Sequence, residues 1–375
     1  MRLIYLSAVT WSSFAQRPHK FVRWFHARTN AEVLWVDPYP TRFPTLADFT
    51  RPRPAPGAKS DVPNWLRVAR VRALPIEPMP VAGWLNVPLW RGLLAQAEAF
   101  ADDDETLLAL GKPTLLALEC VRRLRRCRTL YDAMDDFSAF YQGWSRRAMS
   151  RREQSLVRRV DSVWASSSAL ARYWRAVRAD TQLVRNGLDA EALPEPRKRM
   201  RRAPLVFGYV GTIAAWFDWG IVLALARSRP LDRVRLIGPI YAPCPAPLPG
   251  NIELLPACEH TAALRAMNAF DVGLIPFKRT TLTAGVDPIK YYEYRALGLP
   301  VLSTPFGEMA LRGAEPGVFL ARDEADVGQV AAMAAAHDAP AAESFVSRNT
   351  WDARFDAACL PMMVLPRAAP SDAVD

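Results

Sequence analysis

The sequence predicts an α/β protein made of two doubly wound, Rossmann-like domains with parallel sheets and a cleft between them. Its 375 residues are more than one compact core usually holds. Short β-branched runs alternate with helical patterns along almost the whole chain, as in parallel sheets covered by helices. The polar, basic stretch EALPEPRKRMRRAP interrupts this alternation, which then begins again. We therefore expect domains at 1–190 and 205–345, a linker at 191–204, and a C-terminal helix and tail at 346–375.

The first domain is expected to open with a strand, a helix and a strand, at 2–9, 19–28 and 31–38. Residues 38–63 are rich in Pro and include RPRPAPG, which predicts a long loop. The apolar segment 76–95 contains Trp84 and Trp90 next to an Arg. It is either an interfacial membrane patch or a buried or acceptor-binding segment.

Later elements of this domain continue the alternation. They are a strand and a helix within 106–126, a strand at 128–136, a helix at 146–160, a strand and a helix within 161–177, and a strand at 181–189. The Ser cluster at 166–168 predicts the N-cap of the helix that follows it.

The second domain repeats the pattern. Its elements are a strand at 205–212, a helix ending near 228, strands at 233–239 and 251–256, a helix at 261–270, a strand at 271–277, and a helix followed by a strand within 287–304. In doubly wound folds of this kind, ligands bind at the carboxyl ends of the strands.

The charge pattern leaves several partners open. Lys and Arg number 48 against 38 Asp and Glu, a formal net charge of +10, and much of the excess is Arg in clusters at 120–128, 145–160 and 197–202. Such clusters attract nucleic acid, anionic lipid or a polyphosphate substrate, and they also occur on solvated helix faces. The apolar share of 50% and the charged share of 23% argue against disorder.

The cysteine and terminal patterns indicate a compartment. Five widely spaced Cys without a C-x-x-C pair, and only four His, support neither a zinc site nor a disulfide framework. The N-terminal MRLIYLSAV predicts a strand and not a signal peptide. The sequence also lacks a run of about 18 uncharged apolar residues that would predict a spanning helix. We expect a cytoplasmic protein, with peripheral attachment to the inner membrane as an alternative.

Two stretches of the second domain carry binding chemistry. LVFGYVGTIAAWFDW predicts a strand, a turn at Gly208 and Gly211, and a helix start whose N–H groups would face an anion; a tight turn without a ligand is the alternative. DPIKYYEY puts Lys290 and Glu293 on one helix face. A Lys in the first turn opposes the helix dipole unless an anion lies there. A diphosphate would supply that anion and a ribose could hydrogen-bond Glu293, while a surface ion pair is the alternative.

A family resemblance rests on these and other residues. The pattern P-x-K-x-x-E-Y-x-A-x-G-x-P-V at 288–301 resembles the donor-binding signature of GT-B nucleotide-sugar glycosyltransferases, in particular the family 4 (group 1) type. GYVGTIAAWFD, VRNGLD, YDAMDDFSAF and the segment from Trp11 to Phe21 resemble stretches of bacterial exopolysaccharide glycosyltransferases. The resemblance implies a GT-B fold, with the donor held mainly by the C-terminal domain and the acceptor by the N-terminal one.

The resemblance also implies roles for single residues. By position, Lys290 would contact the donor diphosphate and Glu293 its ribose, with Gly211 and Thr212 lining the phosphate side. The loop SSFAQRPHKF, where GT-B enzymes place an acceptor-facing loop, would bring Arg17 or His19 to the acceptor or to a donor phosphate, and a structural role for the His is the alternative. WDARFDAACLPMM resembles the C-terminal helix that crosses back to the first domain in this fold.

The stereochemistry depends on one departure from the family pattern. Retaining family 4 enzymes usually have a second Glu eight residues ahead of Glu293, and here that position is Gly285. YDAMDD resembles the segment of the xanthan glucuronosyltransferase that holds its catalytic Asp, which maps a base for inverting transfer onto Asp135. Repulsion among Asp132, Asp135 and Asp136 could raise one pKa toward neutrality. Neighbouring residues of an extended segment point to opposite sides, so one of the last two should reach the cleft and the other cap the next helix.

The sequence thus predicts a glycosyltransferase that moves a sugar from a UDP- or GDP-sugar to a glycan or lipid-linked acceptor in bacterial polysaccharide synthesis. No cofactor or metal is expected, because helix ends and Lys290 can neutralise the leaving diphosphate. The D-x-D letters in ADDDE, at 101–105, precede a strand and indicate a solvated loop. Two rivals remain, a nucleotide-sugar epimerase of the same fold and a basic nucleic-acid-binding protein. The second would leave Lys290, Glu293 and Gly211 unexplained, so no nucleic acid partner is expected.

Overall fold

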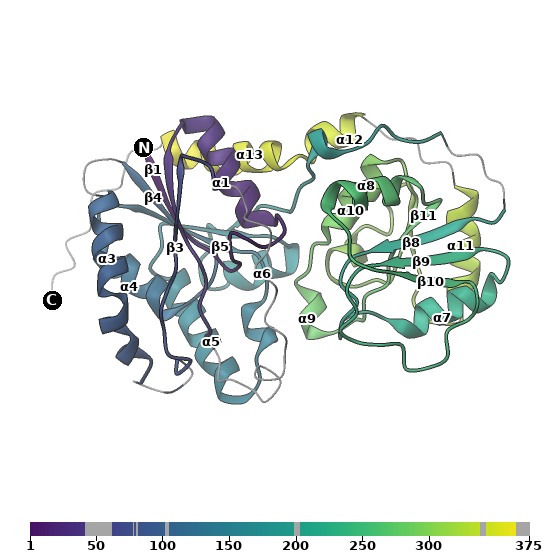
Figure 1. Ribbon diagram of the computed structural model, residues 1–375, viewed down its shortest axis with the longest axis horizontal. Coiled ribbons are helices and arrows are strands. Elements are labelled where there is room, and N and C mark those ends of the chain that lie inside the picture. Colours follow the sequence, from purple (N-terminus) through teal and green to yellow (C-terminus); the bar gives the residue numbers. More distant parts are fainter. Residues whose placement is uncertain are drawn as a thin grey trace.

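The computed structural model describes residues 1–41, 62–77, 79, 82–101, 105–198, 203–337 and 343–364, with side chains described to residue 358 in the last helix. Figure 1 shows two α/β lobes lying side by side, with the C-terminal helices running across the top from one to the other. The two-domain α/β prediction is confirmed. Most of the predicted loop at 38–63, the middle of ADDDE, part of the linker and the tail beyond residue 364 lie outside the described residues.

The N-terminal sheet has seven parallel strands in the order β3-β2-β1-β4-β5-β6-β7. Their bounds are β1 Arg2–Leu6, β2 Glu32–Val36, β3 Leu66–Ala69, β4 Thr106–Leu110, β5 Arg128–Ala133, β6 Ser162–Ala165 and β7 Gln182–Leu183. The helices are α1 Arg17–Thr29, α3 Val87–Ala101, α4 Leu115–Arg123, α5 Gly143–Val157 and α6 Ser168–Arg175, with 3₁₀ turns η1 Ala82–Asn86, η2 Phe137–Phe140 and η3 Ala190–Ala192.

The C-terminal sheet has six parallel strands in the order β10-β9-β8-β11-β12-β13. Their bounds are β8 Val206–Val210, β9 Arg233–Ile237, β10 Ile252–Leu255, β11 Val272–Ile275, β12 Val301–Ser303 and β13 Val318–Leu320. The helical elements are α7 Trp219–Ser228, α8 His260–Asn268, α9 Thr281–Ala284, α10 Ile289–Ala296, η4 Gly307–Leu311, α11 Val327–Ala336, α12 Glu343–Arg348 and α13 Trp351–Val364.

Both faces of the N-terminal sheet are buried, as a doubly wound fold requires. Leu3 and Tyr5 of β1 belong to one apolar cluster, whereas Ile4 and Leu6 belong to another on the opposite face. Successive side chains of a strand point to opposite faces, so a strand covered on both sides must be apolar throughout. This explains why the first strand carries an unbroken apolar run and no alternation.

Helix starts follow the local chemistry of the sequence. The Ser167 hydroxyl accepts the backbone N–H of Leu170 and caps α6, which confirms the cap predicted from the Ser cluster. The helix expected directly after Gly211 is wrong, because α7 begins only at Trp219, where the Asp218 carboxylate caps its first N–H groups. Gly208 lies inside β8, and a Cβ there would come within 2.2 Å of the Phe270 ring. Close packing against Phe270, and not an anion-binding turn, explains why this position is a glycine.

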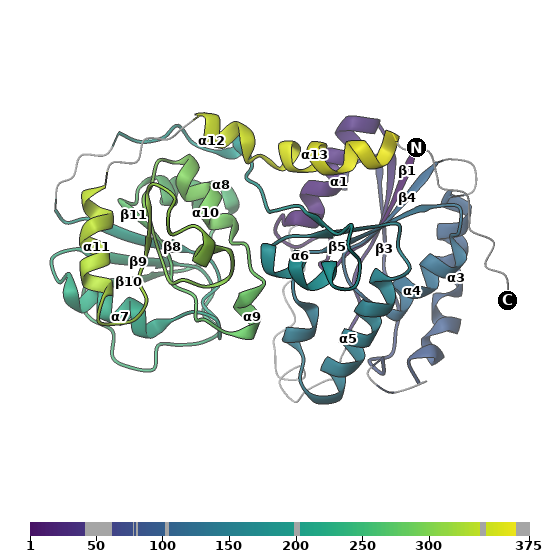
Figure 2. The ribbon, with the colours of Figure 1, turned by 180° about the vertical axis from the view of Figure 1, so that it is seen from behind.

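Helix α13 crosses back to the N-terminal domain and lies along α1 in both views (Figures 1 and 2). Phe355 is fully buried in the cluster that also contains Phe21 and Trp24. The Trp24 indole N–H donates to Asp356 over 2.8 Å, and Arg28 pairs with the same carboxylate. Residues of α13 therefore complete the core of the first domain.

The segment 76–95 divides into two environments. Trp90 lies on α3 and is fully buried against the sheet, so the membrane role considered for this Trp is wrong. Trp84 is 45% exposed, and its neighbours Leu85 and Leu89 are 65% and 48% exposed. None of the helices in the described part of the chain has both the length and the apolar character needed to span a membrane.

Candidate functional site

A cavity of about 260 Å³ opens between the two domains, at the carboxyl ends of β5, β8 and β11. We call it the inter-domain cavity; it is lined by Asp135 and Phe140 from the first domain and by Tyr209, Thr212, Trp216, Phe277, Leu282, Thr283, Val286 and Lys290 from the second. Three of the residues predicted from sequence, Asp135, Thr212 and Lys290, thus meet in one space. Strand ends of a parallel sheet are the expected place for such a convergence.

Asp135 follows β5 on the first-domain side of this cavity. Burial raises the pKa of its carboxyl to about 7, with smaller contributions from Arg17, which lowers it, and from Asp136 and Asp132, which raise it. No hydrogen bond reaches this carboxyl from the residues that the structure describes. Burial, and not the predicted repulsion, is therefore the main reason that this carboxyl can take up a proton near neutral pH.

The two neighbouring aspartates have other partners. Asp132 is fully buried, and its carboxylate accepts two N–H groups of the Arg17 guanidinium at 2.8 and 2.9 Å. The Asp136 carboxylate accepts the Ser138 hydroxyl at 2.8 Å and the Ala139 backbone N–H at 3.1 Å, and so caps η2. The three carboxyl groups thus lie in three different settings, with Asp135 as the one that faces the inter-domain cavity.

Lys290 approaches the cavity from the first turn of α10. Burial lowers the pKa of its ammonium, although nearby Glu293 acts in the opposite direction. Within the described ranges this ammonium makes no hydrogen bond or ion pair, and it lies 5.5 Å from the centre of the Tyr209 ring. A buried ammonium without a carboxylate contact is costly unless an anion joins it.

Gly211 makes room for this Lys. Its φ of +148° is rarely adopted by other residues, and a Cβ there would lie 2.5 Å from Lys290 Cε. Gly238, at the end of β9, has φ +145° and packs so closely that a Cβ would lie 2.1 Å from the carbonyl oxygen of Gly211. The two glycines together bring backbone up to the Lys side chain. Gly238 is absent from the sequence prediction, because nothing local distinguishes it from an ordinary glycine after a strand.

Glu293 lies one turn further along α10 and is 8% exposed. Burial raises the pKa of its carboxyl, while Lys290, His260 and Lys20 lower it. It does not line the inter-domain cavity itself. Lys20 belongs to the first domain, where it pairs with Asp189. Because Lys20 acts on the Glu293 carboxyl, Glu293 also lies at the junction of the two domains.

Arg17 and His19 have structural roles in this conformation. Arg17 is 3% exposed and, besides binding Asp132, donates to the carbonyl oxygen of Val184 at 2.8 Å. His19 is 2% exposed; its Nδ1 accepts the backbone N–H of Gln16 at the start of α1, and its Nε2 lies 3.2 Å from the carbonyl oxygen of Trp11. Contact between either side chain and an acceptor therefore finds no support in the geometry.

The apolar lining of the inter-domain cavity was not predicted from sequence. Tyr209, Trp216 and Phe277 come from β8, the loop after it and the end of β11. In the sequence they are indistinguishable from core aromatics, and Tyr209 and Phe277 are indeed largely buried. Among the described residues, no three His, Cys, Asp or Glu side chains are grouped as metal ligands would be.

Polar contacts join the two domains beside the cavity. The Asn186 backbone N–H donates to Asp287 at 2.9 Å and its side-chain amide donates to the Asp287 carbonyl at 2.7 Å. Within the second domain Arg312 pairs with the same Asp at 2.7 Å, and between the domains Arg185 pairs with Glu308 at 2.9 Å. These contacts fix the position of α10, and hence of Lys290, relative to the first domain.

Comparison with solved structures identifies this architecture. HepE of Anabaena, solved in complex with UDP-glucose, superimposes with a TM-score of 0.64 at 14% identity, covering 97% of this chain and 100% of that one. Sucrose-phosphate synthase of Thermosynechococcus elongatus gives a TM-score of 0.64 at 14% identity, over 97% and 98% of the two chains. The chain has the GT-B fold. A UDP-forming α,α-trehalose-phosphate synthase of Burkholderia vietnamiensis shares this GT-B fold, with a TM-score of 0.62 at 13% identity, over 98% of each chain.

Sequence comparison gives one informative relative. No family model matches the chain. TuaH of Bacillus subtilis (strain 168), provisionally named a teichuronic acid biosynthesis glycosyltransferase, is 25% identical over 235 residues, which is 54% of this chain and 59% of TuaH. The match therefore spans less than two thirds of that relative. The resemblance to GT-B glycosyltransferases is supported by both kinds of comparison.

Proposed function

We propose that this protein is a glycosyltransferase that moves a sugar from a nucleotide diphosphate donor, a UDP- or GDP-sugar, to a glycan or lipid-linked acceptor in bacterial polysaccharide synthesis. One observation carries the proposal: a carboxyl with a pKa of about 7 and an ammonium that has no ion-pair partner among the described residues line the same cavity from opposite domains. The likeness to TuaH and to UDP-sugar-binding GT-B structures supports this assignment.

Lys290 is proposed to bind the donor diphosphate. Its ammonium supplies the charge, and Gly211 lets the diphosphate approach the backbone without a side chain in the way. Thr212 lies at the same wall of the cavity, and Glu293 would accept hydrogen bonds from the ribose. A fixed cation next to the leaving group stabilises the charge that develops on it, so no metal ion is needed for this step.

Asp135 is proposed to act as the general base. The acceptor oxygen attacks the anomeric carbon, the bond to the diphosphate breaks with its electron pair leaving on the diphosphate, and the acceptor proton passes to the Asp135 carboxylate. A carboxyl with a pKa near 7 holds that proton more tightly than an ordinary Asp. A single displacement of this kind inverts the anomeric configuration.

The location proposed for this reaction is the cytoplasmic face of the inner membrane. Exposed Trp84 and Trp144 lie around a hollow that also contains Arg147 and Arg151. Aromatic side chains next to cations are suited to an anionic lipid surface.

The deciding experiment is a panel of UDP- and GDP-sugars, first in thermal-shift binding and then in transfer assays with and without acceptor glycans. A donor that binds only the folded state raises its stability by mass action. Product formed only with acceptor, and with inverted configuration by NMR, would support the proposal. Conversion of the donor without acceptor would indicate an epimerase, and salt-sensitive binding of nucleic acid without nucleotide-sugar binding would indicate a nucleic-acid-binding protein.

A further inference from the structure

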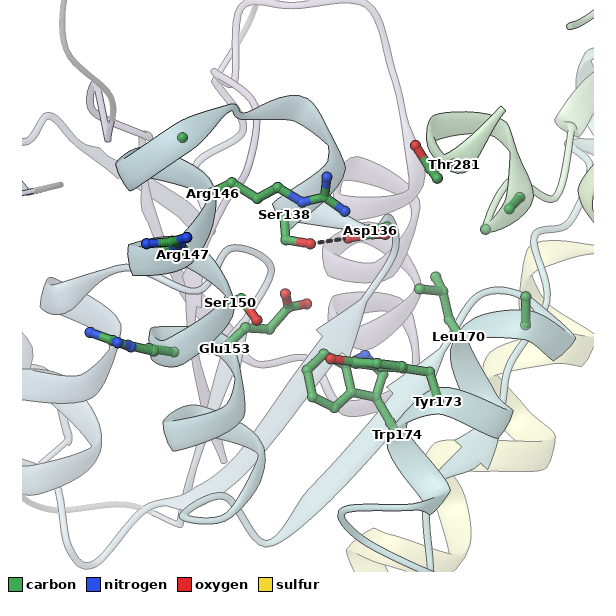
Figure 3. Close-up of a pocket in the computed structure, with 15 residues that line it drawn as sticks. Asp136, Ser138, Arg146, Arg147, Ser150, Glu153, Leu170, Tyr173, Trp174 and Thr281 are labelled. Atoms are coloured by element: carbon green, nitrogen blue, oxygen red, sulfur yellow. Dashed lines mark hydrogen bonds between the residues drawn. The ribbon is translucent and has the colours of Figure 1, made fainter. Parts of the chain in front are cut away.

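A second and larger hollow, of about 750 Å³, lies beside the inter-domain cavity (Figure 3). We call it the arginine hollow. Its walls come from η2, α5 and α6 of the first domain and from α9 of the second. Figure 3 shows the Arg146 side chain extending from α5 toward Ser138 and Asp136, across the mouth of the hollow from Thr281.

The hollow has an excess of positive charge. Arg146, Arg147 and Arg151 line it, and over the described ranges their guanidinium groups make no hydrogen bond or ion pair. This differs from α4, where Arg122 and Arg123 both pair with one Glu. Three unpaired guanidinium groups on one helix repel one another, and a bound anion would relieve that repulsion.

The two carboxyl groups in the hollow do not cancel this charge. Asp136 is occupied with capping η2. Glu153 is 3% exposed, and the Tyr131 hydroxyl donates to one of its oxygens at 2.5 Å. Burial raises the pKa of Glu153 to about 8, so at neutral pH it is mostly uncharged and can donate a hydrogen bond. An uncharged acid at the base of the hollow is compatible with an anion above it.

An apolar wall stands opposite the arginines. Leu170, Tyr173 and Trp174 of α6 form it, with Tyr173 51% exposed and its ring 4.7 Å from the Trp174 ring, centre to centre. Figure 3 shows Tyr173 and Trp174 close to each other on the α6 side of the hollow. Aromatic faces next to hydrogen-bonding groups are suited to a sugar ring, which has one apolar face and polar edges.

The hollow and the inter-domain cavity are neighbours along the chain. Asp135 lines the cavity and Asp136 the hollow, and on α9 Leu282 lines the cavity while Thr281 lines the hollow. Residues that are adjacent in the chain thus line the two spaces, so both lie at the same junction between η2 and α9. The hollow is in the right place for the part of an acceptor that lies behind the reacting hydroxyl.

We propose that the arginine hollow binds a phosphate or diphosphate group attached to the acceptor sugar. The proposal rests on the proposed function and adds to it the chemical class of the acceptor. Arg146, Arg147 and Arg151 bind the phosphate oxygens and Tyr173 stacks on the sugar, which directs a hydroxyl of that sugar toward Asp135. Gly285 also lines the hollow, and its lack of a side chain keeps a further carboxylate out of the anion site.

The test measures binding of glucose 1-phosphate and of inorganic pyrophosphate by calorimetry, with UDP present in saturating amount to fill the donor site. Arg146→Gln is expected to weaken the binding of both probes by about tenfold, the loss typical of one charge-assisted hydrogen bond. Arg158→Gln is the matched control: it removes the same charge from an exposed residue at the end of α5 that does not line the hollow, and it should leave binding unchanged. Free glucose should bind far more weakly than glucose 1-phosphate.

A second pair of variants adds a negative charge to the hollow instead of removing a positive one. Gly285 has φ −92°, and a Cβ there would make ordinary contact with Leu170 at 3.4 Å, so a side chain fits. Gly285→Glu should weaken the binding of glucose 1-phosphate clearly more than Gly285→Gln does. Equal effects of the two would overturn the charge argument.

The outcomes separate this proposal from the proposed function. If UDP binds but neither phosphate probe does, the acceptor assignment is wrong and the donor assignment stands. If UDP itself fails to bind, the proposed function fails first. Equal losses in Arg146→Gln and Arg158→Gln, or an Arg146 effect seen only with phosphatidylglycerol vesicles, would mean that these arginines attract any anionic surface and form no sugar phosphate site.

Discussion

Replacing Asp135 with Asn should stabilise the protein while it removes activity. Burial raises the pKa of Asp135 to about 7, so between pH 4 and 7 the folded protein holds a proton that the unfolded chain has already lost. The wild-type free energy of unfolding therefore falls as the pH rises through this window and levels off above pH 7. Asparagine does not titrate, so the free energy of unfolding of the variant does not fall with pH for this reason.

The magnitude follows from the same pKa. The difference between about 7 in the folded state and 3.8 for an ordinary Asp corresponds to roughly 4 kcal/mol, since one pKa unit is about 1.4 kcal/mol. The stability difference between Asp135→Asn and wild type should grow by up to that amount from pH 4 to pH 8. For a domain of this size, that is a rise of several degrees in the relative melting temperature.

The assay is differential scanning calorimetry of both proteins across this pH range, alongside steady-state transfer. Wild-type kcat should rise with pH and level off above about 7, as expected for a base with that pKa. Asp135→Asn should lower kcat by about 100-fold or more with donor affinity nearly unchanged. Asp136→Asn should affect stability more than turnover, since its carboxylate caps η2. A stability difference that does not change with pH would refute the buried-acid reasoning, and normal turnover in Asp135→Asn would refute the base assignment.

Four other changes test the remaining parts of the site and the proposed membrane contact. Lys290→Ala should weaken UDP binding in calorimetry by about 1.5 to 3 kcal/mol, the value of a charge-assisted contact; an unchanged affinity would remove this Lys from the donor site. Glu293→Gln should cost less, since an amide still accepts one ribose hydrogen bond, and a complete loss of binding would mean that the residue has another role. Gly211→Ala should lower the melting temperature through backbone strain of about 1 to 3 kcal/mol and displace the Lys side chain, and wild-type stability would contradict the close packing. Trp84→Ala should reduce cosedimentation with anionic vesicles at low salt, and sedimentation equal to wild type would leave this Trp as ordinary surface.

The fold was accessible from sequence because parallel strands buried on both faces leave unbroken apolar runs. β1 and β4 are predicted for this reason, whereas β3 and β13, two edge strands that are buried only in part, were not predicted. The candidate site was accessible in part. Lys290 and Asp135 stand in recognisable local patterns, but the hydrogen bonds that bury Arg17 join residues more than 100 positions apart.

The misplaced predictions have a common physical cause. The role expected for Arg17 came from its position in a loop after the first strand, and the sequence gives no sign that Asp132 would take up its guanidinium. Gly208 was assigned to an anion turn because of its spacing from Gly211, while the ring of Phe270 that requires it lies far along the chain. The spacing of residues in the sequence can indicate a turn. Which side chains contact that turn depends on the tertiary structure.

The position of α13 also bears on how the protein is made. During synthesis the first domain leaves the ribosome long before Phe355, which belongs in the middle of its aromatic cluster, has been translated. Until then the α1 face that holds Phe21 and Trp24 has no cover, and an exposed aromatic face of this kind favours association with other chains or with chaperones. The two domains are consequently expected to reach their final state together, since the second domain lies in the chain between the two segments that form a single core.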